Sequence, residues 1–226
     1  MDASLWTEIL SACVSLACYL YKPSHFNKWF VLFLSLTVVV ELTGYSFPFA
    51  SFKIPMYNGF LMFEFVFYSL FMRSFFEKQN GKKILNVVIA IFLMFSFLNL
   101  FFVQGIRILN TNMLTAESII LIAICMFQYI EMINDNNELS LNWPLFCVIT
   151  GVLIFYSANL FNTAIVHSVI KRNSKDLNSL FLLINHSSNV VLYGLFTVAF
   201  CIEVYEQKEA KFKTDPQQID VNELNF

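Results

Sequence analysis

Two glutamates stand inside long apolar stretches of this sequence, Glu41 in "VVVELTGY" and Glu64 in "LMFEFVFY". A carboxylate with apolar neighbours on both sides must find a partner or take up a proton. Ionisable residues in such stretches therefore mark binding sites or ion paths. A third glutamate, Glu117, and one imidazole, His186, occupy comparable positions. Together these groups could bind a cation or exchange protons.

Helical spacing places further polar residues beside these groups. Tyr45 follows Glu41 by four residues and Tyr68 follows Glu64 by four, so each pair shares one helix face. The stretches 156–167 and 185–193 repeat this pattern with asparagine, histidine and tyrosine. The residues that we predict to bind a ligand are Glu41, Tyr45, Glu64, Tyr68, Glu117, Asn159, Asn162, His186, Asn189 and Tyr193.

The same residues do not form the pattern of a known enzyme. The sequence lacks HExxH, GxSxG, P-loop and GxGxxG motifs. Only His167 and His186, and no aspartate, lie in apolar stretches, which argues against a His-rich zinc centre. No lysine stands between Lys175 and Lys208 to form a retinal Schiff base. We therefore expect no catalytic residues, no enzymatic activity, no metal and no cofactor.

The elements that must position these side chains are membrane-spanning helices. The chain has 226 residues, of which 58% are hydrophobic and 13% charged, whereas soluble domains carry about 25% charged residues. A spanning helix needs about 20 mostly apolar residues. Seven stretches qualify: 4–21, 29–50, 57–76, 84–103, 113–133, 144–167 and 178–205. The sequence predicts an all-α, polytopic integral membrane protein, with a seven-helix domain over 1–205 in the lipid bilayer and a polar cytoplasmic tail over 206–226.

Lysine and arginine predict the orientation, because cytoplasmic loops of membrane proteins carry an excess of them. Nine lie on the side of the predicted membrane that holds the C-terminus, and five lie on the other side. This predicts the N-terminus outside and the C-terminus inside. With this orientation, nearly all the polar residues named above lie between mid-membrane and the outer surface, which predicts a polar cavity open to the outside.

Three stretches carry a resemblance to known proteins: "YNGFLMFEFVFYSLF" (57–71), "NWPLFCVITGVLIFYSANLFNTAI" (142–165) and "NVVLYGLFTVAF" (189–200). The chain resembles small, largely uncharacterised seven-helix bacterial membrane proteins whose genes often lie near sensor histidine kinases. This resemblance implies a bacterial inner membrane and a role in signalling. We find no kinase, receiver or DNA-binding pattern in these residues, so signalling would require a membrane or cytoplasmic partner protein.

Three functions fit the sequence. The first is a membrane receptor or sensory accessory protein, with an outward-facing pocket for a small polar or cationic ligand. The second is a small transporter coupled to protons or cations through Glu41 or Glu64. The third is a structural membrane subunit whose polar residues only join helices, as they do in many membrane proteins. A net charge of −2 without a basic stripe argues against binding nucleic acid.

Overall fold

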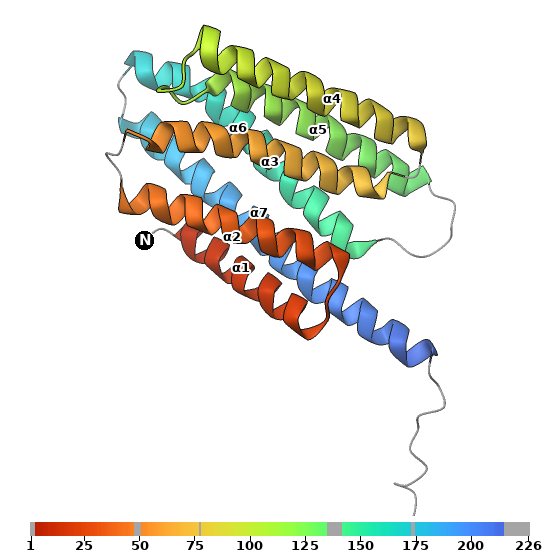
Figure 1. Ribbon diagram of the computed structural model, residues 1–226. Coiled ribbons are helices and arrows are strands. Elements are labelled where there is room, and N and C mark those ends of the chain that lie inside the picture. Colours follow the sequence, from red (N-terminus) through yellow and green to blue (C-terminus); the bar gives the residue numbers. More distant parts are fainter. Residues whose placement is uncertain (1–2, 48–50, 77, 135–141, 173–174, 215–226) are drawn as a thin grey trace, which may run out of the picture.

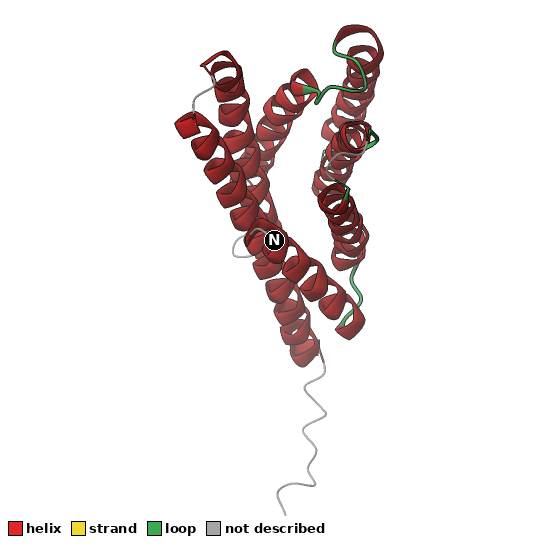
Figure 2. Ribbon diagram, turned by 90° about the vertical axis from the view of Figure 1, so that its left-hand side faces the viewer, coloured by secondary structure: helices red, strands yellow, loops and turns green. Residues whose placement is uncertain are grey.

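The computed structural model describes residues 3–47, 51–76, 78–134, 142–172 and 175–214, and all secondary structure within them is helical (Figure 1, Figure 2). The helices are α1 (Ala3–Tyr21), α2 (His25–Ser46), α3 (Lys53–Phe75), α4 (Gln79–Leu98), the π-helical turn η1 (Asn99–Val103), α5 (Thr111–Asn134), α6 (Trp143–Arg172) and α7 (Lys175–Thr214). Seven helices are long and apolar enough to cross a membrane. The predicted all-helical class and the count of seven are confirmed, and the orientation in a membrane stays a prediction.

Several helix ends differ from the predicted ones. Both α2 and α3 begin four residues early, α2 because the backbone N–H of Asn27 donates to Ser24 Oγ at 3.0 Å and so caps the helix. α7 continues to Thr214, into the predicted tail, because Glu, Gln, Lys and Ala favour a helix whether or not it is apolar. Gln207 Nε2 donates to Glu203 Oε1 at 2.6 Å, one turn away. The rest of that predicted tail, 215–226, lies outside the described residues.

Six of the helices form a closed ring around the centre of the bundle. α1 packs against α2 and α7, α6 packs against α5 and α7, and α3 contacts α2 and α5, while α4 lies outside this ring against α3 and α5. A Cβ on Gly151 of α6 would lie 3.5 Å from the backbone oxygen of Leu192, so this glycine admits α7 closely. α7 projects beyond the other helices at the end opposite the N-terminus (Figure 1).

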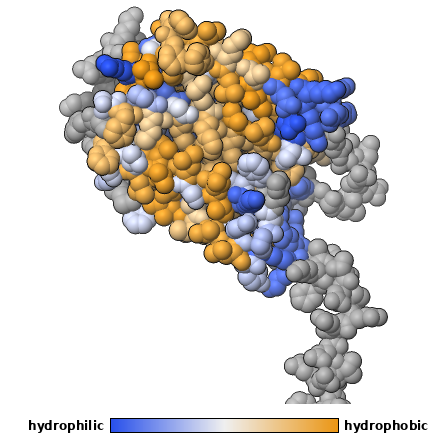
Figure 3. Space-filling view, viewed as in Figure 1, coloured by the Kyte–Doolittle hydropathy of each residue, from blue (hydrophilic) through white to orange (hydrophobic). Residues whose placement is uncertain are grey.

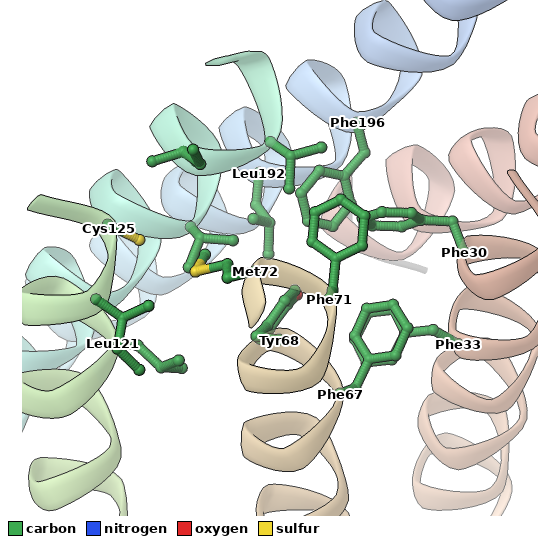
Figure 4. Packing of buried hydrophobic residues seen from close by; sticks show 14 of the residues in the cluster. Phe30, Phe33, Phe67, Tyr68, Phe71, Met72, Leu121, Cys125, Leu192 and Phe196 are labelled. Atoms are coloured by element: carbon green, nitrogen blue, oxygen red, sulfur yellow. The ribbon is translucent and has the colours of Figure 1, made fainter. Parts of the chain in front are cut away.

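An aromatic cluster fills the bundle at the end opposite the N-terminus. Its members come from α2, α3 and α7: Phe30, Phe33, Phe67, Phe71, Phe196 and Phe200. The first five of these are labelled in Figure 4. The rings of Phe33 and Phe67 stack with centroids 4.0 Å apart, and Phe30 meets Phe71 and Phe196 edge-on at 4.9 and 5.1 Å. Such offset and edge-on pairs add to the stabilisation that burial provides. This cluster therefore ties α2, α3 and α7 together.

Much of the outer surface of the bundle is apolar. Apolar side chains cover most of the face in Figure 3, and hydrophilic side chains gather toward the ends of the helices. Phe102 is 77% exposed and Leu20 is 73% exposed. Contiguous apolar surface of this extent is rare on soluble monomers. It fits contact with the hydrocarbon of a lipid bilayer.

The aromatic cluster generates a prediction about stability. Phe30→Ala should lower the free energy of unfolding by about 3–5 kcal/mol, because it leaves a cavity among fully buried rings. The measurement is thermal or denaturant unfolding of purified protein in detergent. Phe161→Ala provides the matched control, since Phe161 is 56% exposed on α6 and its loss should change stability much less. Equal losses in the two variants would contradict the assigned core.

Candidate functional site

Two adjoining cavities lie inside the ring, at the end of the bundle that holds the start of α1 and faces the viewer in Figure 2. The larger, of about 430 Å³, is bounded by α2, α3, α5, α6 and α7, and the smaller, of about 220 Å³, by α1, α2, α3 and α7. Five residues line both cavities: Glu41, Tyr57, Asn185, Asn189 and Tyr193. The two spaces therefore form one site with two chambers that meet at Glu41.

The larger chamber combines apolar walls with a few polar groups. Phe60, Leu61 and Phe155 are among its apolar residues, and Glu64 and Asn159 are among its polar ones. A mainly apolar wall with few polar groups is typical of cavities that bind small organic molecules. This chamber could hold the carbon skeleton of a ligand while the polar groups fix its orientation.

The smaller chamber is the more polar one, and α1 contributes its key group. Glu8 is only 4% exposed although it lies in an otherwise apolar helix. His186 Nδ1 and Ser4 Oγ are 3.0 Å apart, so the imidazole joins α7 to α1 across the chamber. Lys53 also lines this chamber, with its Nζ 5.9 Å from the ring centroid of Tyr57. The chamber thus holds two carboxyl groups, Glu8 and Glu41, and one lysine.

Glu41 is fixed by a tyrosine from the neighbouring helix. The Tyr57 hydroxyl donates to Glu41 Oε2 at 3.1 Å, which joins α2 to α3. Gly44 lies one turn after Glu41, and a Cβ at this position would collide with the Tyr57 hydroxyl group. The glycine therefore makes room for the phenol that orients Glu41.

A second tyrosine lies between two buried carboxyl groups. The Tyr156 hydroxyl donates to Glu117 Oε1 at 2.9 Å, and it also lies within hydrogen-bonding reach of Glu64. Tyr156 has one hydroxyl proton, so it cannot donate to both carboxyl groups at once. Glu117 is fully buried and Glu64 is 8% exposed. These three residues link α3, α5 and α6 at the wall of the larger chamber.

Some polar atoms at the site have no hydrogen-bond partner among the described residues. The side-chain nitrogen and oxygen of Asn162 lack a partner, as does one carboxyl oxygen of Glu8. Both residues line the cavities. Buried polar groups are nearly always paired with protein, water or ligand. These atoms are almost fully covered, so a ligand or water could reach them only if the neighbouring side chains shift.

An asparagine network holds the connection between α4 and α5 over the larger chamber. Asn58 Nδ2 donates to the backbone oxygens of Ile106 and Ile108, and its Oδ1 accepts from the backbone N–H of Asn110 at 3.0 Å. Asn110 in turn accepts from the side chain of Asn99. These bonds anchor the segment that carries Leu109 into the cavity wall.

The structure brings together most of the residues predicted from sequence. Eight of the ten line the cavities: Glu41, Tyr45, Glu64, Asn159, Asn162, His186, Asn189 and Tyr193. The other two, Glu117 and Tyr68, lie behind the wall. Glu117 is covered by Tyr156, and the Tyr68 ring packs between Tyr156 and the aromatic cluster, with centroids 6.0 Å from Tyr156 and 5.2 Å from Phe33.

The prediction missed three residues of the site, Glu8, Tyr57 and Tyr156. Glu8 would have been found from the spacing of α1, where Glu8, Ser11 and Ser15 recur at intervals of three and four residues and form the buried face. Tyr57 and Tyr156 lie on the polar faces of their helices by the same spacing, but only the folded structure shows which carboxyl group each one meets.

The comparisons with known proteins assign no family. No protein-family model matches the chain, and neither a curated protein nor a solved structure resembles it significantly. The chemistry of the site therefore has to be argued from its own residues.

Two buried tyrosines, Tyr156 at the cavity wall and Tyr68 behind it, yield a matched prediction. Tyr156→Phe should lower the free energy of unfolding by about 1–3 kcal/mol, because it leaves the Glu117 carboxyl without its donor. Tyr68→Phe should be neutral or stabilising, because the Tyr68 hydroxyl has no partner within the described part of the chain. Unfolding of both variants in the same detergent gives the comparison, and equal effects would contradict the assigned bond.

Gly44 provides a separate test of the Glu41 environment. Gly44→Ala should lower stability by about 1–3 kcal/mol, because the added methyl displaces the Tyr57 hydroxyl and breaks its bond to Glu41. In a Tyr57→Phe background, Gly44→Ala should lower the free energy of unfolding by a smaller amount. Gly59→Ala is the control, since a Cβ there meets nothing within 4 Å. The double-mutant cycle is read by thermal unfolding, and strict additivity would contradict the contact.

Proposed function

We propose that this protein is a membrane receptor or sensory accessory protein that binds a small organic cation in the two-chambered cavity. The observation that supports this most strongly is the charge of the site. Glu8, Glu41 and Glu64 line the cavities, whereas Lys53 is the one lysine or arginine among the described lining residues. Burying three carboxyl groups beside one ammonium group favours a ligand that brings positive charge.

The walls favour an organic cation over a metal ion. No three His, Cys, Asp or Glu side chains are arranged to hold a metal within the described residues. Tyr57, Tyr193 and Phe60 offer ring faces and edges in the cavity, and aromatic rings attract ammonium groups. A combined space of this size accommodates a metabolite or transmitter-like amine rather than a macromolecule.

The aromatic cluster favours a receptor over a transporter. A carrier must offer its substrate a path to both sides of the membrane. Here the cavity ends near Tyr156 and Tyr193, and beyond them the rings of Tyr68 and Phe196 lie at centroid distances of 6.0–6.3 Å from their neighbours. The six phenylalanine rings of the aromatic cluster lie beyond this point, and in the proposed receptor the ligand would enter and leave from the other side.

α6 and α7 would carry the response. Both helices line the larger chamber, through Asn159 and Asn162 on α6 and Asn185 and Asn189 on α7. In the proposed orientation this chamber opens outward and the far end of α7 lies in the cytoplasm of a bacterial cell. A partner protein at that end would read the position of α7, in keeping with the resemblance to proteins encoded near sensor kinases.

Ligand screening tests the proposal directly. In a thermal-shift assay on purified protein, choline, tetramethylammonium or a polyamine at ten times its Kd should add about 1.4 kcal/mol of stability. This corresponds to a rise in Tm of about 3–5 °C for a chain of this size. Glu41→Gln and Glu64→Gln should each weaken the binding about ten-fold, because each removes a charge-assisted hydrogen bond.

Two matched controls show whether binding depends on the charge of the ligand and whether it takes place in the cavity. The neutral carbon isostere of choline should not stabilise the protein, and Glu209→Gln on α7 beyond the cavity should bind as the wild type does. The proposal fails if no cation stabilises the wild type more than the two cavity variants. Movement of a stabilising cation across sealed proteoliposomes, lost in Glu41→Gln, would instead identify a transporter.

A further inference from the structure

A groove of about 390 Å³ runs between α2 and α3, in the half of the bundle that contains the aromatic cluster. Leu32 of α2 and Val66 and Leu70 of α3 form its walls, together with the outer faces of Phe67 and Phe71. α2 and α3 contact each other more sparsely than most neighbouring helices of the ring. Leu32 is 61% exposed and Leu70 is 41% exposed, so the groove opens onto the outer surface.

The groove carries a cation at one end and no acidic residue among its lining. Arg73 and Ser74 lie at the end of α3, opposite Trp29 in the first turns of α2. The Nε atom of Arg73 is buried and has no acceptor among the described residues. Tryptophan is enriched at membrane interfaces, and a planar guanidinium group suits a phosphate. The polar end of the groove therefore has the composition of a headgroup site.

The length of the groove matches one leaflet of a bilayer. From Phe63 in the middle of α3 to Ser74 near its end, the helix rises about 16 Å. The hydrocarbon of one leaflet is about 15 Å thick, half of a core of about 30 Å. An acyl chain that starts beside Arg73 would therefore end near Phe63, at mid-membrane.

We propose that this groove is a binding site for an anionic glycerophospholipid, whose acyl chain lies between α2 and α3 and whose phosphate accepts from Arg73. Charge complementarity favours an anionic lipid over a zwitterionic one. Lys28 and Lys78 flank the same end of α2 and α3 and add positive potential there. Basic side chains next to membrane helices attract anionic lipids in this manner. The site is independent of the cation cavity and of the function proposed for it.

The lipid would complete the packing of the two helices. Phe67 and Phe71 belong both to the groove and to the aromatic cluster, so an acyl chain on their outer faces would press on the rings that hold α2, α3 and α7 together. Occupancy of the groove is thus expected to favour this arrangement of the bundle.

Trp29 is a built-in reporter for the test. In a Trp6→Phe/Trp143→Phe background, the full chain is reconstituted into vesicles in which either phosphatidylglycerol or phosphatidylethanolamine carries brominated acyl chains, which quench a tryptophan that they contact. Brominated phosphatidylglycerol should quench Trp29 at a mole fraction about five-fold lower than brominated phosphatidylethanolamine does, since one basic side chain contributes about that factor. Arg73→Gln should reduce this preference, because it removes the guanidinium group and leaves only the neighbouring lysines.

The controls keep the result interpretable. Arg107→Gln removes the same charge at the opposite end of the bundle and should retain the preference, as should Arg73→Lys, which also shows whether Arg73→Gln merely misfolds. Equal quenching by the two lipids in the parent protein, or a preference that is unchanged in Arg73→Gln, would overturn the proposal. Weak quenching by both lipids would overturn it too, and would indicate that protein, such as a second copy of the chain, covers the groove.

Discussion

Carboxyl groups inside an apolar bundle need hydrogen-bond donors beside them, and two tyrosine hydroxyls meet much of this need. Tyr156 donates to Glu117 and Tyr57 donates to Glu41. Each bond crosses between helices, so it compensates a buried acid and fixes the spacing of two helices at once. The glycine opposite Tyr57 is required for the same reason, because a larger residue would occupy the position of the phenol. The cavity keeps its shape through these contacts.

The bundle is organised in the reverse sense of a soluble protein. α1 shows this most clearly, since it buries Glu8, Ser11 and Ser15 and exposes Trp6 and Leu20. The polar atoms then have only each other, a ligand or trapped water as partners. In the opposite half of the bundle aromatic rings fill most of the interior, although Asn27 is buried there as well. The two halves of the molecule therefore differ in composition, since one contains the cavities and the other the aromatic cluster.

Much of this arrangement could be predicted from the sequence, because apolar length sets the number of helices and spacing sets which residues share a face. Glu41 and Glu64 were recognisable from the sequence, because a carboxylate in an apolar stretch needs a hydrogen-bond partner, a counter-ion or a proton. Periodicity gives a direction around the helix axis but not a distance from the centre of the bundle. Tyr68 and Glu117 were therefore expected at the cavity although they lie one layer behind it, and Tyr156, which covers Glu117, was missed. The end of α7 was misplaced because polarity was taken to end a helix that composition continues.

α7 also has mechanical properties that follow from its length. It is unbroken over 40 residues, about 60 Å at the usual rise, of which about 37 Å lies beyond Asn189. Along the helix, Asn189 at the cavity lies about 10 Å from Phe196 in the aromatic cluster, whereas Thr214 lies about 27 Å beyond it. If α7 pivots at these rings, a small displacement at the cavity becomes a larger displacement of the far end. Displacement, rather than any change of fold, is then the quantity that a neighbouring molecule would sense.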